Sequence, residues 1–499
     1  MPQLLVSRRS VLATGLGFAA AGLSRAQSSV PSDLAGISLK QAADLLRQKR
    51  VSSVELTQLC LQRIAKYNPV YHAFITVTSD LALATARERD EQLRRGQMLG
   101  PLHGVPIALK DNIDTAGIRT TGASAVFADR IPTIDAPVAA KLKSAGSVLL
   151  GKLNLHEFAA GGTSVITYFG PVRNPWNPDY APGGSSGGSA TAIAADLCYG
   201  TLGTDTGGSI RTPSAYCSTV GFKPTYGRVS NRGVIPLTWS LDHVGPITKS
   251  VEDAAILLGI IAGYDDEDIS TVDIPVSDYH AAIGRETKTL RLGIPRAMFY
   301  DRLDPDHERA IAEAINVLQK ITASMKDVTL PHVSDFGGLR GESYAYHRDL
   351  LANNANKYQL PTRRGFQNAE KALASDYVLA WRELQQVRRQ ARKVFQDVDI
   401  LVTPTTPRPP YTVEESIKRA EMERLPPLLS NTGPFDVYGL PTISVPGGFT
   451  KSGLPIGLQL SGAPWAESTV LSIAHAYQQS TDWHLRKPAL REEPIPEKS

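Results

Sequence analysis

The sequence predicts an α/β fold in which one large mixed sheet is covered by helices on both faces. Short apolar segments typical of buried strands alternate along the chain with amphipathic segments of helical period. Such alternation favours a single sheet between two helical layers. Hydrophobic residues make up 42% and charged residues 20% of the 499 residues, as in ordinary globular proteins, and no internal repeat interrupts the pattern.

The first elements are helices. Residues 38–95 place apolar side chains at i, i+3 and i+4, and Ser52 followed by Glu55 predicts a capping box at the start of a second helix. The segment GVPIALKD, which contains Lys110, then predicts a strand. The next predicted elements are a helix over 138–145 and a strand in SVLLGKLNL.

The second half of the chain continues the alternation. The acidic and polar stretch 265–289 predicts a boundary between a central region of about 96–263 and a C-terminal half of about 289–485, followed by a tail at 486–499. The predicted helices lie within 245–263, 304–321 and 375–398, and the predicted strands are RLGIPR, DILVTPTTP, LPTISVPGGF and LPIGLQLSG.

The N-terminus carries an export pattern. A twin-arginine pair at Arg8 and Arg9 precedes an uncharged run and a small-residue motif that ends at Ala26. This order is typical of a signal peptide over residues 1–26. We therefore expect a mature chain from Gln27 in the bacterial periplasm. The apolar run is too short to span a bilayer, so no stable membrane insertion is expected after processing; a retained anchor is the alternative.

Charge and cysteine content argue against several classes of function. The chain has 53 basic and 49 acidic residues and a net charge of +4, which is too balanced to indicate nucleic-acid or anionic-membrane binding. Cys60, Cys198 and Cys217 lie among apolar residues without metal-ligand spacing, and we expect buried free thiols. The expected partner is a small molecule, and no metal is predicted.

Two glycine–serine clusters are the most informative feature of the chain. They occupy the ends of segment 181–211, with Ser185 in the first cluster and Ser209 in the second. Glycines beside a serine leave backbone N–H groups unshielded, which suits an exposed nucleophile with an oxyanion hole. Upstream, Lys110 lies among apolar residues, where burial would lower the pKa of its amine and allow it to act as a base.

Three other interpretations fit parts of this pattern. A flexible linker is disfavoured by the apolar helix and strand pattern between the clusters, and a phosphate loop by the missing Gly-Lys-Ser/Thr. Residues 184–188 also match the G-x-S-x-G elbow, which would make Ser186 the nucleophile. That elbow requires an acid and a histidine downstream in recognisable contexts, and it gives the second cluster no role.

These residues resemble the amidase signature family, whose triad is Ser–cis-Ser–Lys. The resemblance covers roughly residues 39–484 and rests on long motifs, among them GVPIALKDNIDTAG, RNPWNPDYAPGGSSGGSATAIAAD and GTDTGGSIRTPSAYCSTVGFKPTYGRVS. It implies one domain over residues 27–499. The implied fold is an α/β/α sandwich around a mixed, mostly parallel sheet of about eleven strands, without metal or organic cofactor.

The resemblance also assigns roles to residues of this chain. Ser209 matches the nucleophile, Ser185 the bridging serine on a cis peptide bond from Gly184, and Lys110 the base. The matching oxyanion-hole donors are the backbone N–H groups of Thr206, Gly207, Gly208 and Ser209. Three supporting residues are expected: Ser186 as a structural neighbour, and Asp205 and Arg211 as a pair that holds the nucleophile loop.

The predicted function is hydrolysis of a linear carboxamide to a carboxylate and ammonia or an amine through a Ser209 acyl-enzyme. No nucleic-acid partner is expected, and a homodimer is the assembly considered. One alternative is the glutamine-amide-hydrolysing subunit of a tRNA-dependent amidotransferase, which the export pattern disfavours. The other is a non-catalytic binding protein on the same scaffold, which the intact triad disfavours.

Substrate contacts are the least determined part of the prediction. Two positions depart from the family pattern: Asp436 stands where asparagine is frequent, and His243 where the tRNA-linked branch has glutamine. The proposed substrate contacts are Asn112, Tyr168, Trp239, Tyr346 and Phe435.

Overall fold

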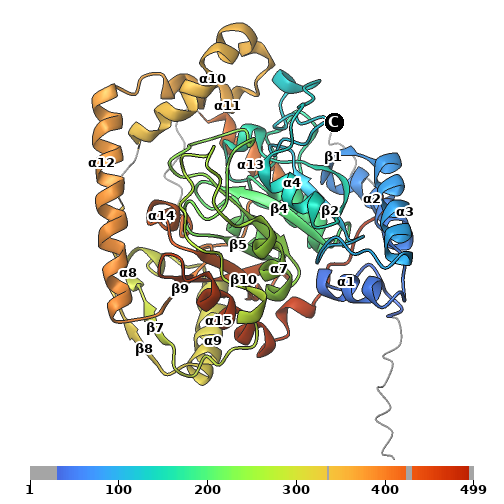
Figure 1. The fold of residues 1–499 in the computed structure, drawn as a ribbon. Helices are drawn as coiled ribbons and strands as arrows, with labels where there is room; N and C mark the ends of the chain where they lie inside the picture. The colour runs from blue at the N-terminus through green and yellow to red at the C-terminus, as the bar shows by residue number, and fades with distance from the viewer. Residues whose placement is uncertain (1–30, 334–336, 423–429, 494–499) are drawn as a thin grey trace, which may run out of the picture. The chain divides into compact units, whose positions relative to one another are not determined.

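Eleven strands form one mixed sheet in the computed structural model, which describes residues 31–333, 337–422 and 430–493 (Figure 1). Their order across the sheet is β1-β3-β2-β4-β6-β5-β10-β11-β9-β7-β8. This confirms the predicted large mixed sheet. The strands are β1 (Phe74–Val77), β2 (Pro106–Lys110), β3 (Val148–Leu153), β4 (Gly200–Asp205), β5 (Val220–Lys223), β6 (His243–Thr248), β7 (Arg291–Ile294), β8 (Ser324–Asp327), β9 (Ile400–Pro404), β10 (Thr442–Phe449) and β11 (Pro455–Gly462).

The sheet is not mostly parallel, which corrects the expectation. Parallel pairing is confined to β3-β2-β4 and β9-β7-β8, and the other neighbouring pairs of the described sheet are antiparallel. The hairpin β10–β11 illustrates the cause, because its short connection around Gly453 allows only antiparallel pairing. Buried apolar runs predict a strand but do not reveal its direction.

Helices cover both faces of the sheet. They are α1 (Leu39–Arg47), α2 (Ser53–Tyr71), α3 (Ser79–Arg94), α4 (Pro137–Ser144), α5 (Gly187–Ala194), α6 (Arg211–Cys217), α7 (Val251–Ile261), α8 (Arg296–Phe299), α9 (Pro305–Ile321), α10 (Gly341–Asn354), α11 (Leu360–Ala369), α12 (Ala374–Ala391), α13 (Val413–Glu421), α14 (Gly433–Val437) and α15 (Glu467–Gln479). On β11, Gly457 faces Ala215 of α6 and Gly462 faces Val470 of α15. Their odd separation along the strand puts these helices on opposite faces.

The N-terminal helices agree with the sequence except for one strand. The predicted helical stretch 38–95 contains α1, α2 and α3, but it also contains β1, whose four residues were too few for a period to appear. The capping box at Ser52 is present, with both of its hydrogen bonds to Glu55. The twin-arginine segment 1–26 lies outside the described residues. Across the described ranges, no helix is both long and apolar enough to cross a bilayer.

Parallel neighbours in the sheet bring the predicted site residues to one edge. β2 and β4 pair in parallel, and Lys110 and Asp205 are their last residues. The carboxyl ends of parallel neighbours meet at the same edge of a sheet, and there the loop from β4 to α6, which carries Ser209, begins. Every residue of β2 and β4 is buried, so this edge lies inside the molecule.

Candidate active site

Lys110 and Ser185 meet directly at this edge of the sheet. The Lys110 Nζ lies 2.7 Å from Ser185 Oγ and 2.7 Å from Thr204 Oγ1, within hydrogen-bond distance of both. The peptide bond between Gly184 and Ser185 is cis, as the resemblance implied. Thr204 was not predicted, because nothing in its sequence context separates it from other strand threonines.

The environment of Lys110 favours a neutral amine. Its side chain is fully buried, and its hydrogen-bond partners are neutral oxygens of Ser185 and Thr204. Burial lowers the pKa of Lys110 to about 7, although the negative charges of Asp205 and Asp242 oppose the shift. An amine with such a pKa can accept a proton near neutral pH, as a general base must.

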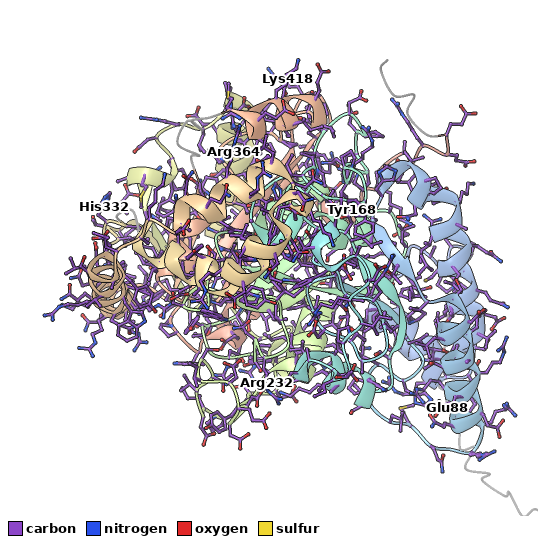
Figure 2. All side chains as sticks on the ribbon, turned by 90° about the horizontal axis from the view of Figure 1, so that it is seen from above. Glu88, Tyr168, Arg232, His332, Arg364 and Lys418 are labelled. Atoms are coloured by element: carbon purple, nitrogen blue, oxygen red, sulfur yellow. The ribbon has the colours of Figure 1, made fainter. Side chains whose placement is uncertain are left out.

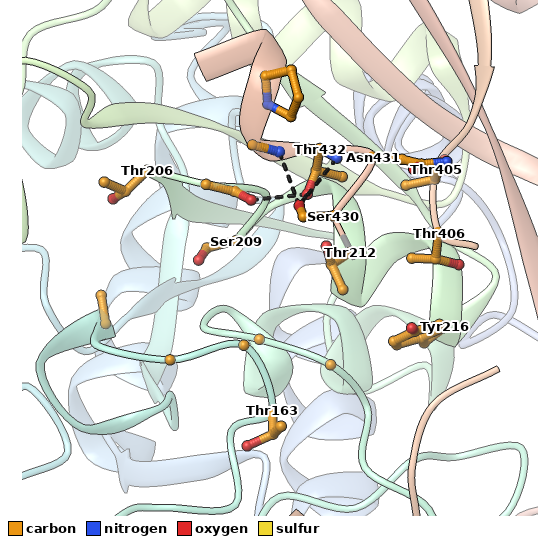
Figure 3. A pocket seen from close by; sticks show the side chains of 18 of the residues that line it. Thr163, Thr206, Ser209, Thr212, Tyr216, Thr405, Thr406, Ser430, Asn431 and Thr432 are labelled. Atoms are coloured by element: carbon orange, nitrogen blue, oxygen red, sulfur yellow. Dashed lines mark hydrogen bonds between the residues drawn. The ribbon is translucent and has the colours of Figure 1, made fainter. Parts of the chain in front are cut away.

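Ser209 lies on the wall of a cavity of about 680 Å³ (Figure 3). Loop 206–210 carries Ser209. Gly183 and Gly184, from the first glycine–serine cluster, line the same cavity. The hydrogen bonds found among the described residues do not include one between the Ser185 and Ser209 hydroxyls. The structure therefore brings Lys110 and Ser185 into contact and places Ser209 at the cavity surface beside them.

Asp205 organises the nucleophile loop from inside. Its carboxylate accepts hydrogen bonds from the backbone N–H groups of Gly208, Ser209 (2.9 Å) and Ile210 (3.1 Å). It also pairs with Arg211, at 2.9 Å from Nε and 3.1 Å from Nη2, so the expected Asp205–Arg211 pair is present. Burial alone would raise the pKa of Asp205, but the Arg211 guanidinium holds it below its ordinary value.

These contacts correct the predicted oxyanion hole. The N–H groups of Gly208 and Ser209 donate to Asp205, so they are not free to face a substrate oxygen. Thr206 and Gly207 line the cavity, and within the described residues their N–H groups have no hydrogen-bond partner. Two of the four predicted donors therefore remain available.

A distant segment holds the nucleophile loop from its other side. Arg211 donates to the Thr432 carbonyl (2.9 Å) and to Asp436 Oδ2 (2.6 Å), and Thr432 Oγ1 donates to the Gly207 carbonyl (2.8 Å). Sequence reasoning missed Thr432, because more than two hundred residues separate it from the loop. Sequence reasoning also left the partner of Asp436 open. In the structure the Asp436 carboxylate forms a second ion pair with Arg211, beside that of Asp205.

Ser186 contributes to packing in this structure. Its hydroxyl donates to the Thr204 carbonyl (3.1 Å), and its N–H donates to the Ser209 carbonyl (3.1 Å). It is buried and is not among the cavity-lining residues, which disfavours the elbow interpretation. Within the part of the chain that the structure describes, no group of His, Cys, Asp or Glu side chains has the arrangement of a metal site.

The predicted substrate contacts are not on the cavity wall. Asn112 is buried and donates to Thr204 Oγ1 (3.1 Å), and Phe435 is buried in the core. Tyr168 is 54% exposed on the surface (Figure 2), and neither Trp239 nor Tyr346 lines the cavity. Instead, the polar side chains of the wall are mostly hydroxyl-bearing, and many of them are labelled in Figure 3: Thr163, Thr206, Ser209, Thr212, Tyr216, Thr405, Thr406, Ser430 and Thr432.

Comparisons with known proteins show which family the chain resembles. The family model described as Amidase matches residues 55–471. The chain is 42% identical to a glutamyl-tRNA(Gln) amidotransferase subunit of Geotalea daltonii, over 92% of this chain and 100% of that protein. Among solved structures, the subunit of the same name from Thermotoga maritima has 31% identity and a TM-score of 0.77, covering 93% of this chain and 99% of that one. The peptide amidase of Stenotrophomonas maltophilia has 31% identity and a TM-score of 0.79, covering 91% and 98%.

Proposed function

Because the chain belongs to the amidase family, we propose that it hydrolyses carboxamides through an acyl-enzyme on Ser209. The observation that carries the proposal is the buried Lys110 amine, which lies 2.7 Å from Ser185 Oγ and has a pKa lowered to about 7. Ser209 faces the cavity in front of this pair. A neutral amine linked to a hydroxyl relay is what activation of a serine nucleophile requires.

Acylation would proceed in one proton circuit. Ser209 Oγ attacks the amide carbonyl while its proton passes to Ser185 Oγ and the Ser185 proton passes to Lys110 Nζ. The N–H groups of Thr206 and Gly207 donate to the oxyanion. The C–N bond then breaks, and the leaving nitrogen takes the proton back from Lys110 through Ser185. The relay needs the Ser209 side chain to turn toward Ser185, and catalytic hydrogen bonds commonly tighten only when substrate binds.

Deacylation would use the same groups in the opposite direction. Water gives a proton to the Ser185–Lys110 relay and attacks the ester carbonyl of the acyl-enzyme. The Ser209 C–O bond breaks, and the proton returns to Ser209 Oγ. The products are a carboxylic acid, ionised at neutral pH, and a regenerated enzyme.

Direct detection of the acyl-enzyme tests the proposal. Brief reaction with a p-nitrophenyl ester, followed by acid quenching and peptide mass spectrometry, should place one acyl group on Ser209. Ser209→Ala should abolish both labelling and amide hydrolysis, whereas Ser186→Ala, a matched change one residue after Ser185, should still acylate. Acylation at Ser186, or normal turnover by Ser209→Ala, would exclude this mechanism.

A narrower second candidate is favoured by the curated relatives. They are 39–42% identical over about nine tenths of this chain and are named as subunits of glutamyl-tRNA(Gln) amidotransferase. On this reading the chain releases ammonia from the side-chain amide of glutamine, works with partner subunits and serves a tRNA-bound acceptor. The relatives support this candidate more strongly than they support an independent amidase.

Activity assays of the purified chain, with and without partner subunits, distinguish the two candidates. An independent amidase should hydrolyse simple amides at a rate that added partner subunits do not change. An amidotransferase subunit should have weak glutaminase activity alone and should gain activity with the remaining subunits and charged tRNA. The assay should include glutamine, aryl amides and peptide amides at equal concentrations.

The N-terminal pattern supports a location outside the cytoplasm. We propose that residues 1–26 direct the chain to the periplasm by the twin-arginine route. This location would separate the enzyme from cytoplasmic tRNA, so it bears on the choice between the two candidates. Cell fractionation of the full chain tests it.

A further inference from the structure

The cavity in front of Ser209 has an uneven distribution of charge. Among the described residues on its wall, the charged side chains are Arg340 and Arg408, with no carboxylate. A substrate with an ammonium group would find no negative partner on this wall. A substrate with a carboxylate would be matched by a guanidinium. Arg340 is exposed, so solvent screens its charge, and Arg408 is the better placed of the two.

Two contacts hold Arg408 in position, and a third fixes the segment after β9 that carries it. The Tyr216 hydroxyl donates to the Arg408 carbonyl (3.2 Å), and the Arg408 guanidinium lies 3.7 Å from the centre of the Tyr411 ring. The Ala181 N–H donates to the Tyr411 carbonyl (3.0 Å), which ties this segment to the first glycine–serine cluster. Tyr216 and Tyr411 also line the cavity.

The Arg408 charge has no ion-pair partner within the described ranges. Glu415 is the nearby carboxylate, but it accepts hydrogen bonds from the Thr412 N–H and hydroxyl at the start of α13. Arg419 lies against the same Tyr411 ring at 4.4 Å and adds a second positive charge. Burial, with a contribution from Arg419, lowers the pKa of Arg408, as expected for a cation whose charge is incompletely compensated.

The cavity has room for a chain between the nucleophile and this cation. Ser209, Thr212 and Tyr216 follow one another along one side of the cavity, as Figure 3 shows. Tyr216 lies near the end of α6, and its hydroxyl donates to the Arg408 carbonyl, so the Arg408 segment lies at the end of this side away from Ser209.

We propose that Arg408, with Tyr216 and Tyr411, forms a subsite for a carboxylate carried by the amide substrate. The preferred substrates are therefore amides with an anionic group at the end distant from the scissile bond. This inference rests on the proposed amide hydrolysis, because Ser209 defines the other end of the substrate.

Kinetics with paired substrates test the subsite. The probes are monoamides of four- to eight-carbon dicarboxylic acids and the neutral alkyl amides of matched length. We expect the acidic amides to be preferred over the neutral amides, mainly through a lower KM. Arg408→Gln should reduce kcat/KM for them by about 10- to 100-fold, the loss typical of one charged hydrogen bond, and leave the neutral amides unchanged. Arg408→Lys should retain part of the preference.

Arg419→Gln is the matched control, because it removes a positive charge beside the same ring but not from the cavity wall. An equal effect of the two glutamine variants, or an equal loss for acidic and neutral amides, would overturn the proposal. Calorimetric binding of suberate to Ser209→Ala, with and without Arg408→Gln, separates the two claims. If suberate binding depends on Arg408 but the wild type hydrolyses no amide, only the proposed reaction is refuted. If suberate binding does not depend on Arg408, the subsite is refuted.

Discussion

The buried amine of Lys110 determines the pH dependence expected at the scale of the residue. Its pKa is lowered to about 7, and only the neutral form can accept the Ser185 proton. We therefore expect kcat/KM for a neutral amide to rise with pH and to level off above a midpoint near 7. A pH–rate profile measured with a non-ionising substrate checks this, and Lys110→Ala should lose most of the activity.

Asp242 is the control for that assignment. Burial raises the pKa of Asp242 to about 6, and its carboxylate accepts a hydrogen bond from Thr206 (2.6 Å) beside the nucleophile loop. Asp242→Asn should keep a single midpoint but move it below 7, because the negative charge of Asp242 raises the pKa of Lys110. A midpoint that disappears in this variant would transfer the pH dependence from Lys110 to Asp242.

The same lysine contributes a pH-dependent cost to folding. Between pH 7 and its ordinary pKa of 10.5, Lys110 is neutral in the folded chain and protonated in the unfolded chain. The unfolded state then binds more protons, so the contribution of this group to the free energy of unfolding rises with pH across that window. Comparing urea unfolding of the wild type and Lys110→Met at pH 7.5 and 9.5 isolates the effect. A difference between the two proteins that is independent of pH would contradict it.

Asp205 and Asp436 provide a second comparison between single residues. Both pair with Arg211, but Asp205 also accepts three backbone N–H groups, while Asp436 Oδ1 has no hydrogen-bond partner within the described chain. Burial raises the pKa of Asp436 despite the nearby guanidinium.

Asp205→Asn should therefore cost about 3–5 kcal/mol, as the loss of a buried charge partner usually does, and should also inactivate the enzyme. Asp436→Asn should cost clearly less, because an amide oxygen can still accept from Arg211. Urea unfolding and amide hydrolysis measure both effects. Equal losses in the two variants would contradict the special role of Asp205 in the nucleophile loop.

At the scale of the element, the loop between β4 and α6 requires glycine at one position. Gly208 has φ +127°, and a Cβ there would lie 2.0 Å from Thr432 Oγ1. A Cβ on Gly207 would meet no atom within 4 Å. We expect Gly208→Ala to displace the loop and abolish acylation of Ser209, because an L-residue is strained at this φ whatever the space.

Gly207→Ala is the matched control. It should fold normally and should lose at most part of its activity, because its N–H remains available to the oxyanion. Labelling with a fluorophosphonate compares the two variants without a choice of amide substrate. Normal labelling of Gly208→Ala would show that the contact with Thr432 does not hold the loop.

Sequence patterns predict local elements well and distant contacts poorly. Lys110, Ser185 and Ser209 were identifiable because each lies in a motif that departs from ordinary strand or loop composition. Thr432 was not, because its role depends on the pairing of strands far apart in the chain. The availability of the Gly208 N–H was also beyond prediction, since it depends on where the Asp205 carboxylate points and not on residue type.

At the scale of the whole molecule, the two halves of the chain share one sheet. β5 pairs with β10 across the polar stretch 265–289, and Arg211 in the first half is bonded to Thr432 and Asp436 in the second. We therefore expect unfolding in urea to be one cooperative transition, with loss of far-UV circular dichroism and loss of Ser209 labelling at the same midpoint. Separate midpoints would indicate that the halves fold independently.

The export proposed for the full chain would determine where this chemistry can act. A twin-arginine signal depends on the pair itself, so Arg8→Lys with Arg9→Lys should retain the chain in the cytoplasm, although the net charge is unchanged. The matched control is Arg25→Lys, which leaves the pair intact and should not alter localisation. Because this route carries folded proteins, Ser209→Ala should be exported as efficiently as the wild type, while Gly208→Ala should be exported only if it folds. Fractionation followed by immunodetection compares these variants with the wild type. Equal cytoplasmic retention of the wild type and the double variant would rule out the leader.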